Sequence, residues 1–493
     1  MLNSLVWTQI DEIYCEEINT VLKQSGTFPF GISSGDPSSS SVFLCTTLNP
    51  FQIKNKSGVR CQLSEREDFN EVYREFTAIP SETNAFSVKI YAYGLAEYKT
   101  YYYRFIYGEA YSDVGITKTL PANPDHLSFA VVSCSNYEWG YFNAYEAIAK
   151  QKNLDFIIHL GDYIYEYGPG VYGAKDIARK HLPSHELLSL KDYRSRYAQY
   201  RLDPQLQLLH RSIPMISVWD DHEIANDAYK DGAQNHQAEE GSWETRKSNA
   251  QKAYFEWLPI ADNTQNSVRR SFHMGSLMDL YMLDERLEGR TKQGQVDSVL
   301  SGGNNTMLGN DQLNWLTNEM KEHHSTWTVL GNQVLFSSLV IPEGINEIKS
   351  SNDMWDGYPM ERDQLTNQWI ADRKKDILVL TGDAHCSFSI EMKIQDQVLG
   401  KEWVTPSVTS ANLNERISNC KTKKIERKIK KPKINATLDF INLRDHGYMV
   451  VVLNHEEATA TWFKVNARKS GKLKAKKLFK DIFLKSREMD KKA

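Results

Sequence analysis

Residues 154–168, LDFIIHLGDYIYEYG, indicate the fold class of this chain. The apolar run 154–160 suits a strand buried on both faces, and Gly161 and Asp162 end it. A turn uses the glycine and tolerates the aspartate, but it does not need Tyr165 three residues later. The stretch therefore predicts a buried strand with a polar cluster at its carboxyl end.

Four further apolar runs end in the same way. The polar residues that follow them are Cys134, Ser135 and Asn136; Asp220, Asp221, His222 and Glu223; Asn332 and Gln333; and Asp383 and His385. Helical patterns separate these runs, so the sequence predicts βαβ units and sheets covered by helices. Ligands bind beyond the carboxyl ends of such strands, and we expect the clusters to converge if the strands lie in neighbouring sheets.

Several carboxylates that lie close together need a positive charge beside them, because each negative charge raises the pKa of its neighbours. A bound cation provides it, and aspartate, asparagine and histidine are ordinary ligands of divalent metals. The thiolate of Cys134 and the phenolate of Tyr165 would suit iron(III) or zinc, and the two oxygens of Asp162 could bridge two ions. The alternative is that each aspartate is a turn or cap residue and that Cys134 is a small buried apolar residue.

The chain divides into regions of different pattern. Residues 1–26 read as an amphipathic helix, and 27–120 contain short alternating segments separated by turns, which predict an antiparallel β-sandwich. After a linker, residues 125–465 carry the strand–helix alternation of the predicted catalytic domain. Within it, 446–465 is expected to form a β-hairpin.

Basic residues are concentrated in two segments, although the net charge of the chain is −4. Residues 421–433 hold eight basic and one acidic residue, and the tail 466–493 holds eleven and three. We interpret 421–433 as an exposed insertion. The tail is expected to be a helix that is solvated or packed, or that makes peripheral contact with an anionic membrane. No recognition fold accompanies the charge, so no nucleic-acid partner is expected.

Several segments in register resemble the PhoD-type alkaline phosphatases of the calcineurin-like metallophosphatase superfamily. They are VVSCSNYEWGYFNAYEAIA, HLGDYIYEYG, WDDHEIANDAY, LMDLYMLDER, TMLGNDQLNWL, TVLGNQV, DMWDGYPMER and LTGDAHCS. The resemblance spans about residues 29–465. It implies an α/β four-layer sandwich, two mixed sheets flanked by helices, preceded by a fibronectin type III-like β-sandwich.

The resemblance also implies the cofactors, iron(III) and calcium, with zinc or manganese as alternatives. Iron would be held by Cys134, Asp162, Tyr165 and the pair at 383–385, and calcium by carboxylates. The metal ligands expected on this basis are Cys134, Asp162, Tyr165, Asp221, Asp383 and His385.

The implied reaction is hydrolysis of a phosphate ester. The metals would bind phosphoryl oxygens and lower the pKa of a bound water, and the resulting hydroxide would attack phosphorus in line. His222 would stabilise the transition state or protonate the leaving oxygen, and Asn136 would hydrogen-bond a phosphoryl oxygen. We interpret Asp284 and Arg286 as a structural ion pair. The candidate substrate-binding residues are Asn332, Asp356 and Tyr358.

Two alternative functions remain open at this stage. Phosphodiesters or phospholipids could be the substrates instead of monoesters, or the fold could serve a non-catalytic binding protein. The chain is expected to be a monomer. No export signal is visible, which favours the cytoplasm, whereas most proteins that the chain resembles act outside it.

Overall fold

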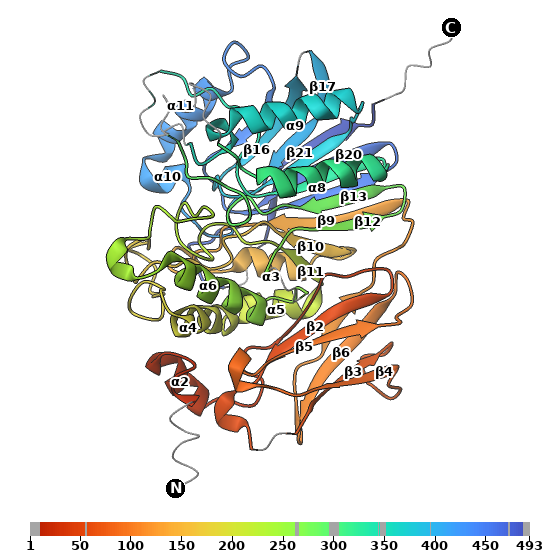
Figure 1. Ribbon diagram of the computed structural model, residues 1–493, viewed down its shortest axis with the longest axis vertical. Helices are drawn as coiled ribbons and strands as arrows, with labels where there is room; N and C mark the ends of the chain where they lie inside the picture. The colour runs from red at the N-terminus through yellow and green to blue at the C-terminus, as the bar shows by residue number, and fades with distance from the viewer. Residues whose placement is uncertain are drawn as a thin grey trace.

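A computed structural model gives the fold of the chain (Figure 1). It describes residues 10–54, 57–261, 266–294, 305–343, 345, 352–394, 396–471 and 474–486. The first nine residues of the predicted N-terminal helix and the last seven of the basic tail lie outside the described residues. Among the described helices, none combines the length and apolarity that a membrane span requires.

A nine-stranded mixed sheet forms one half of the central sandwich. Its strands, in spatial order, are β21 (Lys476–Leu484), β20 (Glu457–Lys464), β19 (Gly447–Asn454), β9 (His126–Val132), β10 (Phe156–His159), β11 (Met215–Ser217), β1 (Ile32–Gly35), β2 (Ser41–Thr47) and β5 (Ser87–Tyr93). The run β9–β10–β11–β1 is parallel. The predicted hairpin at 446–465 is confirmed, since β19 and β20 pair antiparallel.

A seven-stranded sheet forms the other half. Its order is β12 (Arg270–Met274), β13 (Met278–Met282), β14 (Trp327–Asn332), β15 (Ile377–Thr381), β17 (Gln397–Val404), β16 (Ser387–Ile394) and β18 (Leu438–Asn442). The central strands β13, β14, β15 and β17 are parallel. The strands that precede the polar clusters therefore lie in two neighbouring sheets, as the sequence argument requires.

The N-terminal β-rich region supplies a third sheet. It contains β4 (Arg74–Ala78), β3 (Val59–Ser64), β6 (Thr100–Tyr107) and β7 (Ala110–Tyr111), with β8 (Gly115–Lys118) paired to β6. The other strands of this region, β1, β2 and β5, extend the nine-stranded sheet. Gly35 allows this junction, because a Cβ there would lie 2.3 Å from the Pro259 carbonyl oxygen.

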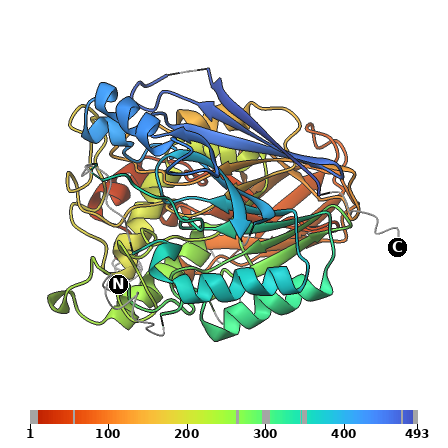
Figure 2. The ribbon, with the colours of Figure 1, turned by 90° about the horizontal axis from the view of Figure 1, so that it is seen from above.

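Helices cover the outer faces of the two central sheets. Among the described residues, the α-helices with assigned bounds are α2 (Glu16–Lys23), α3 (Asn143–Ala149), α4 (Leu190–Arg201), α5 (Pro204–Ser212), α6 (Trp243–Trp257), α8 (Gly309–Glu322), α9 (Pro359–Ala371), α10 (Leu413–Arg416) and α11 (Asn419–Ile429). Short 3-10 turns occupy Pro50–Gln52, Glu82–Asn84, Ala238–Glu240 and Trp355–Gly357. Figures 1 and 2 show α8 and α9 side by side over the seven-stranded sheet.

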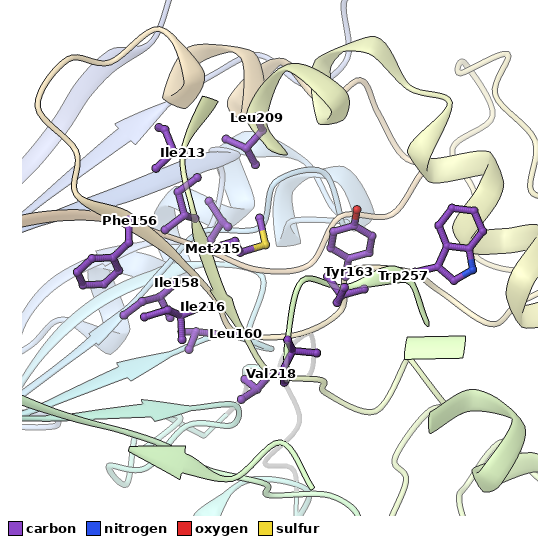
Figure 3. Packing of buried hydrophobic residues seen from close by; sticks show 14 of the residues in the cluster. Phe156, Ile158, Leu160, Tyr163, Leu209, Ile213, Met215, Ile216, Val218 and Trp257 are labelled. Atoms are coloured by element: carbon purple, nitrogen blue, oxygen red, sulfur yellow. The ribbon is translucent and has the colours of Figure 1, made fainter. Parts of the chain in front are cut away.

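The main hydrophobic core lies between the two central sheets and continues beneath α3, α4, α5 and α6. Figure 3 shows one part of it, where Ile158 and Leu160 pack near Ile216 and Val218. A second core joins α8 and α9 to the outer face of β13, β14 and β15. Burial on both faces explains the continuous apolar runs of these strands. The predicted fold class, an α/β four-layer sandwich with an N-terminal β-sandwich, is confirmed.

Two local predictions are wrong. The segment 421–433 is not an exposed insertion, because its first part forms α11, which buries Ile425 and Ile429. The tail is not a helix, since 476–484 form β21 on the open edge of β20. Within the predicted N-terminal helix 1–26, the described residues contain α2, which follows a turn that buries Ile13 and Tyr14.

Candidate metal centre

The carboxyl ends of strands from both central sheets meet at one place. Cys134 follows β9, Asp162 follows β10, and His385 follows β15. One ligand atom from each of these residues lies within 4.8 Å of the others. Residues up to 251 positions apart in sequence, Cys134 and His385, therefore belong to a single group with thiol, carboxylate and imidazole donors.

Two further groups of the same kind adjoin the first. Asp162, Asp221 and His222 form one, and Asp220, Asp221 and Asp383 form the other. Asp162 belongs to two groups, and so does Asp221. The three groups are thus continuous, and we name them together the central cluster: Cys134, Asp162, Asp220, Asp221, His222, Asp383 and His385.

The backbone at these strand ends is unusual. Cys134, Asp162, Asp383 and His385 have φ values of 61°, 55°, 49° and 51°. Residues other than glycine rarely adopt this left-handed conformation, and such residues concentrate at functional sites. Gly161 precedes Asp162 and has φ 95°, and a Cβ there would lie 2.4 Å from that of Asp220. The glycine of the quoted stretch lets two strand ends approach closely.

Tyr165 lies at the centre of this arrangement. Its hydroxyl donates to Asp162 Oδ2 at 2.8 Å, accepts from Ser410 Oγ at 2.6 Å, and lies 3.3 Å from His385 Nε2. Burial, together with the nearby carboxylate of Asp162, raises the pKa of the phenol well above its usual value. A bound cation would oppose that shift, because its positive charge favours the phenolate.

Three acidic groups of the central cluster, those of Cys134, Asp162 and Asp383, are costly to ionise without a cation. Burial raises the pKa of Asp162 to about 6, and it raises the pKa values of Cys134 and Asp383 well above their ordinary values. Asp162 Oδ1 and Asp221 Oδ1 are buried and lack a hydrogen-bond partner. These oxygens, with a neighbouring thiol and imidazole, are a donor set that fits metal ions.

His222 is held by a carboxylate outside the cluster. Its Nδ1 lies 2.7 Å from Glu166 Oε2, while Glu166 Oε1 accepts from Asn226 N and Asn235 Nδ2. Burial alone would lower the pKa of His222, but Asp221 and Glu166 raise it well above its ordinary value. Glu166 therefore fixes the orientation of the imidazole that faces Asp162.

Arg286 is not the partner of Asp284 that the sequence suggested. Its buried guanidinium bonds to Asp220 Oδ1 at 2.5 Å and to Asp353 Oδ1 at 2.7 Å. Its Nη2 lies 3.5 Å from Asp221 Oδ1 and 3.7 Å from Asp383 Oδ1. Asp284 Oδ1 accepts main-chain bonds from residues 286 and 287. Arg286 is thus the cation that partly neutralises one side of the central cluster.

The segment DMWDGYPMER reaches the centre through a different residue from those predicted. Tyr358 is buried in the core beside α9 and donates to the Thr291 carbonyl at 2.8 Å. Asp356 pairs with Arg362 at 2.7 Å. Neither is brought to the central cluster, whereas Asp353 bonds to Arg286. The segment therefore adjoins the centre through Asp353, and the assignment of Asp356 and Tyr358 as substrate-binding residues stays a prediction.

The two predicted asparagines lie near the cluster with their side chains already bonded. Asn136 Nδ2 donates to the Tyr172 carbonyl at 3.0 Å, and its Oδ1 accepts from Glu138 N. Asn332 Nδ2 donates to Thr381 Oγ1 at 3.1 Å, and its Oδ1 accepts from Trp355 Nε1 at 3.2 Å. Both contribute structural hydrogen bonds, and their substrate contacts stay predictions.

The fold and the central cluster together define a class of protein, a metal-dependent hydrolase with its site at strand ends between two sheets. Family models agree with this class. The PhoD-like phosphatase model matches residues 129–462, and the model of its N-terminal domain matches residues 16–121.

Individual relatives give the same result. Alkaline phosphatase D of Bacillus subtilis (strain 168) is 35% identical over 434 residues, which is 83% of this chain and 74% of that protein. A solved structure of PhoD matches with a TM-score of 0.83 and 32% identity, covering 94% of this chain and 91% of that one. The chain belongs to the PhoD-like phosphatase family and is a metal-dependent hydrolase of phosphate esters.

Proposed function

We propose that the central cluster is the catalytic metal centre and that it holds iron(III) beside calcium. Cys134, Tyr165 and His385 would hold iron, Asp221 and Asp383 would hold calcium, and Asp162 would bridge the two. The observation that carries this proposal is the position of Asp162, which belongs to two adjacent ligand groups and has one oxygen without a hydrogen-bond partner. Thiolate and phenolate ligands favour iron, and carboxylates favour calcium.

Bound cations would supply Lewis acidity and lower the pKa of a water molecule. Around them, the chain supplies orientation and charge. His222, held by Glu166, is placed to donate a proton or hydrogen bond to an oxygen of the substrate. Arg286 bonds to Asp220 and fixes its position, so that the carboxylates of the cluster retain one arrangement.

We propose that the substrate includes phosphodiesters as well as monoesters. An open cleft of about 810 Å³ reaches the site at Asp353 and Asp227. Asp353 bonds to Arg286, and Asp227 N donates to Asp221 Oδ2 at 2.6 Å, so the cleft adjoins the central cluster. A second ester group could lie in this cleft. The turnover of bis-p-nitrophenyl phosphate relative to p-nitrophenyl phosphate would rank the two substrate classes.

Replacement of Asp162 tests the metal centre. Asp162→Asn removes the charge shared by two ligand groups, so we expect loss of metal and a fall in turnover of at least about 10²-fold. Metal content by mass spectrometry and hydrolysis of p-nitrophenyl phosphate are the measurements. Asp113→Asn is a suitable control, because Asp113 is exposed and pairs with Arg211. Wild-type turnover in Asp162→Asn would refute the assignment.

Replacement of Cys134 tests the identity of the metal. Cys134→Ser exchanges a soft thiolate for a hydroxyl, which should lower the iron content and change the visible absorption of the protein. If the wild-type protein contains zinc or manganese and no iron, the assignment of iron fails while the position of the centre stands.

A further inference from the structure

A second set of ligand-type side chains lies at the opposite end of β13. His273 on β12, Asp279 on β13 and His323 at the C-terminal cap of α8 each place one ligand atom within 4.8 Å of the others. Glu319, in the last turn of α8, joins them, since its Oε2 lies 3.3 Å from His273 Nε2. We name these four residues the β12–α8 cluster.

The contacts within this cluster are close. His273 Nδ1 lies 2.9 Å from Asp279 Oδ1, and the rings of His273 and His323 stack with centroids 3.6 Å apart and planes at 17°. Asp279 is only 3% exposed. Its second oxygen accepts from Ser325 N at 3.2 Å. One buried carboxylate and two adjacent imidazoles therefore share a small volume.

The β12–α8 cluster is separate from the catalytic centre. Asp279 stands near the amino end of β13, whereas Arg286 follows its carboxyl end. The strand rises about 3.3 Å per residue, so the three residues from Asp279 to the end of β13 at Met282 alone separate the two sites by roughly 10 Å. No residue belongs to both clusters. Figure 1 shows β12, β13 and α8 together at the side of the seven-stranded sheet.

The charge of the cluster is suited to a cation. Within the part of the chain that the structure describes, His273 is the only basic residue that forms an ion pair with Asp279 or Glu319. Lys374 lies close by, but its Nζ donates to the His323 carbonyl and contacts His324 Nδ1. The C-terminal end of α8 adds a partial negative charge, which also favours a cation.

We propose that the β12–α8 cluster binds a zinc-type divalent cation. Two imidazole nitrogens with carboxylate oxygens form an ordinary tetrahedral zinc ligand set. Such an ion would join the edge strand β12 to the end of α8 and would stabilise that side of the sheet. The proposal does not depend on which metals occupy the catalytic centre.

Zinc binding by matched variants tests this site. The full-length protein is equilibrated with zinc and dialysed, and bound zinc per chain is measured by mass spectrometry. We expect His323→Ala to hold one equivalent fewer than the wild type, with at least tenfold weaker affinity at that site by calorimetry. His324→Ala is the control, because His324 is the adjacent histidine and lies outside the ligand group. It should bind zinc as the wild type does.

Two further variants make the result decisive. Asp162→Asn should lose metal from the catalytic centre and keep the zinc equivalent held by the β12–α8 cluster, whereas His323→Ala should keep phosphatase turnover. His323→Asn removes the imidazole with less loss of volume, and it replaces the alanine variant if that one fails to fold. Equal zinc content and affinity in the wild type and in a folded His323 variant would overturn the proposal, whether or not the phosphatase assignment holds.

Discussion

Glu166 illustrates how residues outside the ligand set contribute to the site. It contacts His222 through one oxygen and two groups of the 226–235 loop through the other. Glu166→Gln preserves shape but removes the charge that orients and stabilises the protonated imidazole. We expect kcat to fall about 10- to 100-fold while the metal content remains, as is typical when the partner of a functional histidine is lost.

The matched control for this variant is Glu186→Gln. Glu186 pairs with Arg246 away from the central cluster and lies in the same region of the chain. Steady-state kinetics and metal analysis of both variants provide the comparison. Loss of metal in Glu166→Gln with a normal kcat per bound metal would contradict the role given to Glu166.

Arg286 yields a prediction about stability. Arg286→Met would leave Asp220 and Asp353 buried without their cation, and removal of one member of a buried pair costs about 3–5 kcal/mol. Urea unfolding monitored by circular dichroism measures the change. Arg211→Met serves as the control, since Arg211 forms an exposed pair with Asp113 and should cost under about 1 kcal/mol. Equal effects of the two variants would show that Arg286 is not a structural cation.

The sequence predicted the residues that converge in the central cluster better than the residues that contact them. Asp162 and His385 could be located because they follow apolar strands, and parallel strands bring such ends together. Glu166 and Arg286 carried no such signal. Glu166 lies in a loop, and Arg286 is preceded by two acids, so a local ion pair was the simplest interpretation. Only the packing of both sheets determines that Arg286 faces Asp220 and Asp353 instead.

At the scale of elements, the tail shows that the secondary structure of a segment depends on its hydrophobic period and on the strand available to pair with it. The tail segment 474–486 fits a helical pattern, but it also has a period of two that turns Phe479, Asp481 and Phe483 inward. Asp481 Oδ2 accepts from Ser389 Oγ at 2.6 Å. The open edge of β20 offers main-chain bonds along the whole segment, which a separate surface helix would lack. The sequence alone does not show that β20 has an open edge, so the strand at 476–484 could not be predicted from it.

The basic helix α11 allows a test of whether its apolar face is packed against the protein. Ile429 is fully buried against the third hydrophobic core, whereas Lys424 faces solvent. Ile429→Ala should lower the free energy of unfolding by about 2–5 kcal/mol, and Lys424→Ala by less than about 0.5 kcal/mol. Denaturant titration compares them. If both variants unfold like the wild type, α11 is an exposed appendage after all.

At the scale of the whole molecule, the N-terminal β-sandwich shares a sheet with the catalytic half. β1 pairs parallel with β11, so one sheet runs from the N-terminal region through the catalytic half. Arg270 reinforces the junction through a 2.8 Å pair with Asp36. Asp36 and Arg270 are 234 positions apart in sequence, and no local pattern predicts their contact. The turn cluster at 36–38 was sufficient to predict a β-rich region but not the sheet that it joins.

Buried histidines couple the stability of the whole fold to pH. His159 is fully buried in β10, its Nε2 lies 2.9 Å from the Tyr145 hydroxyl, and burial lowers its pKa to about 3. The unfolded chain takes up this proton near pH 6.5. Stability from His159 is therefore complete above pH 6.5 and is lost as the pH falls toward 3, because the unfolded state then binds more protons.

His159→Gln isolates this contribution from carboxylates such as Asp162, whose raised pKa has the opposite effect. At pH 7.5 we expect the variant to be less stable than the wild type by about 1–2 kcal/mol, because it disturbs the bond to Tyr145. At pH 5 the wild type should have lost about 2 kcal/mol through His159, so the two proteins should become nearly equal. Urea unfolding at both pH values measures the difference, and a difference that stays constant with pH would show that His159 is protonated in the folded protein as readily as in the unfolded chain.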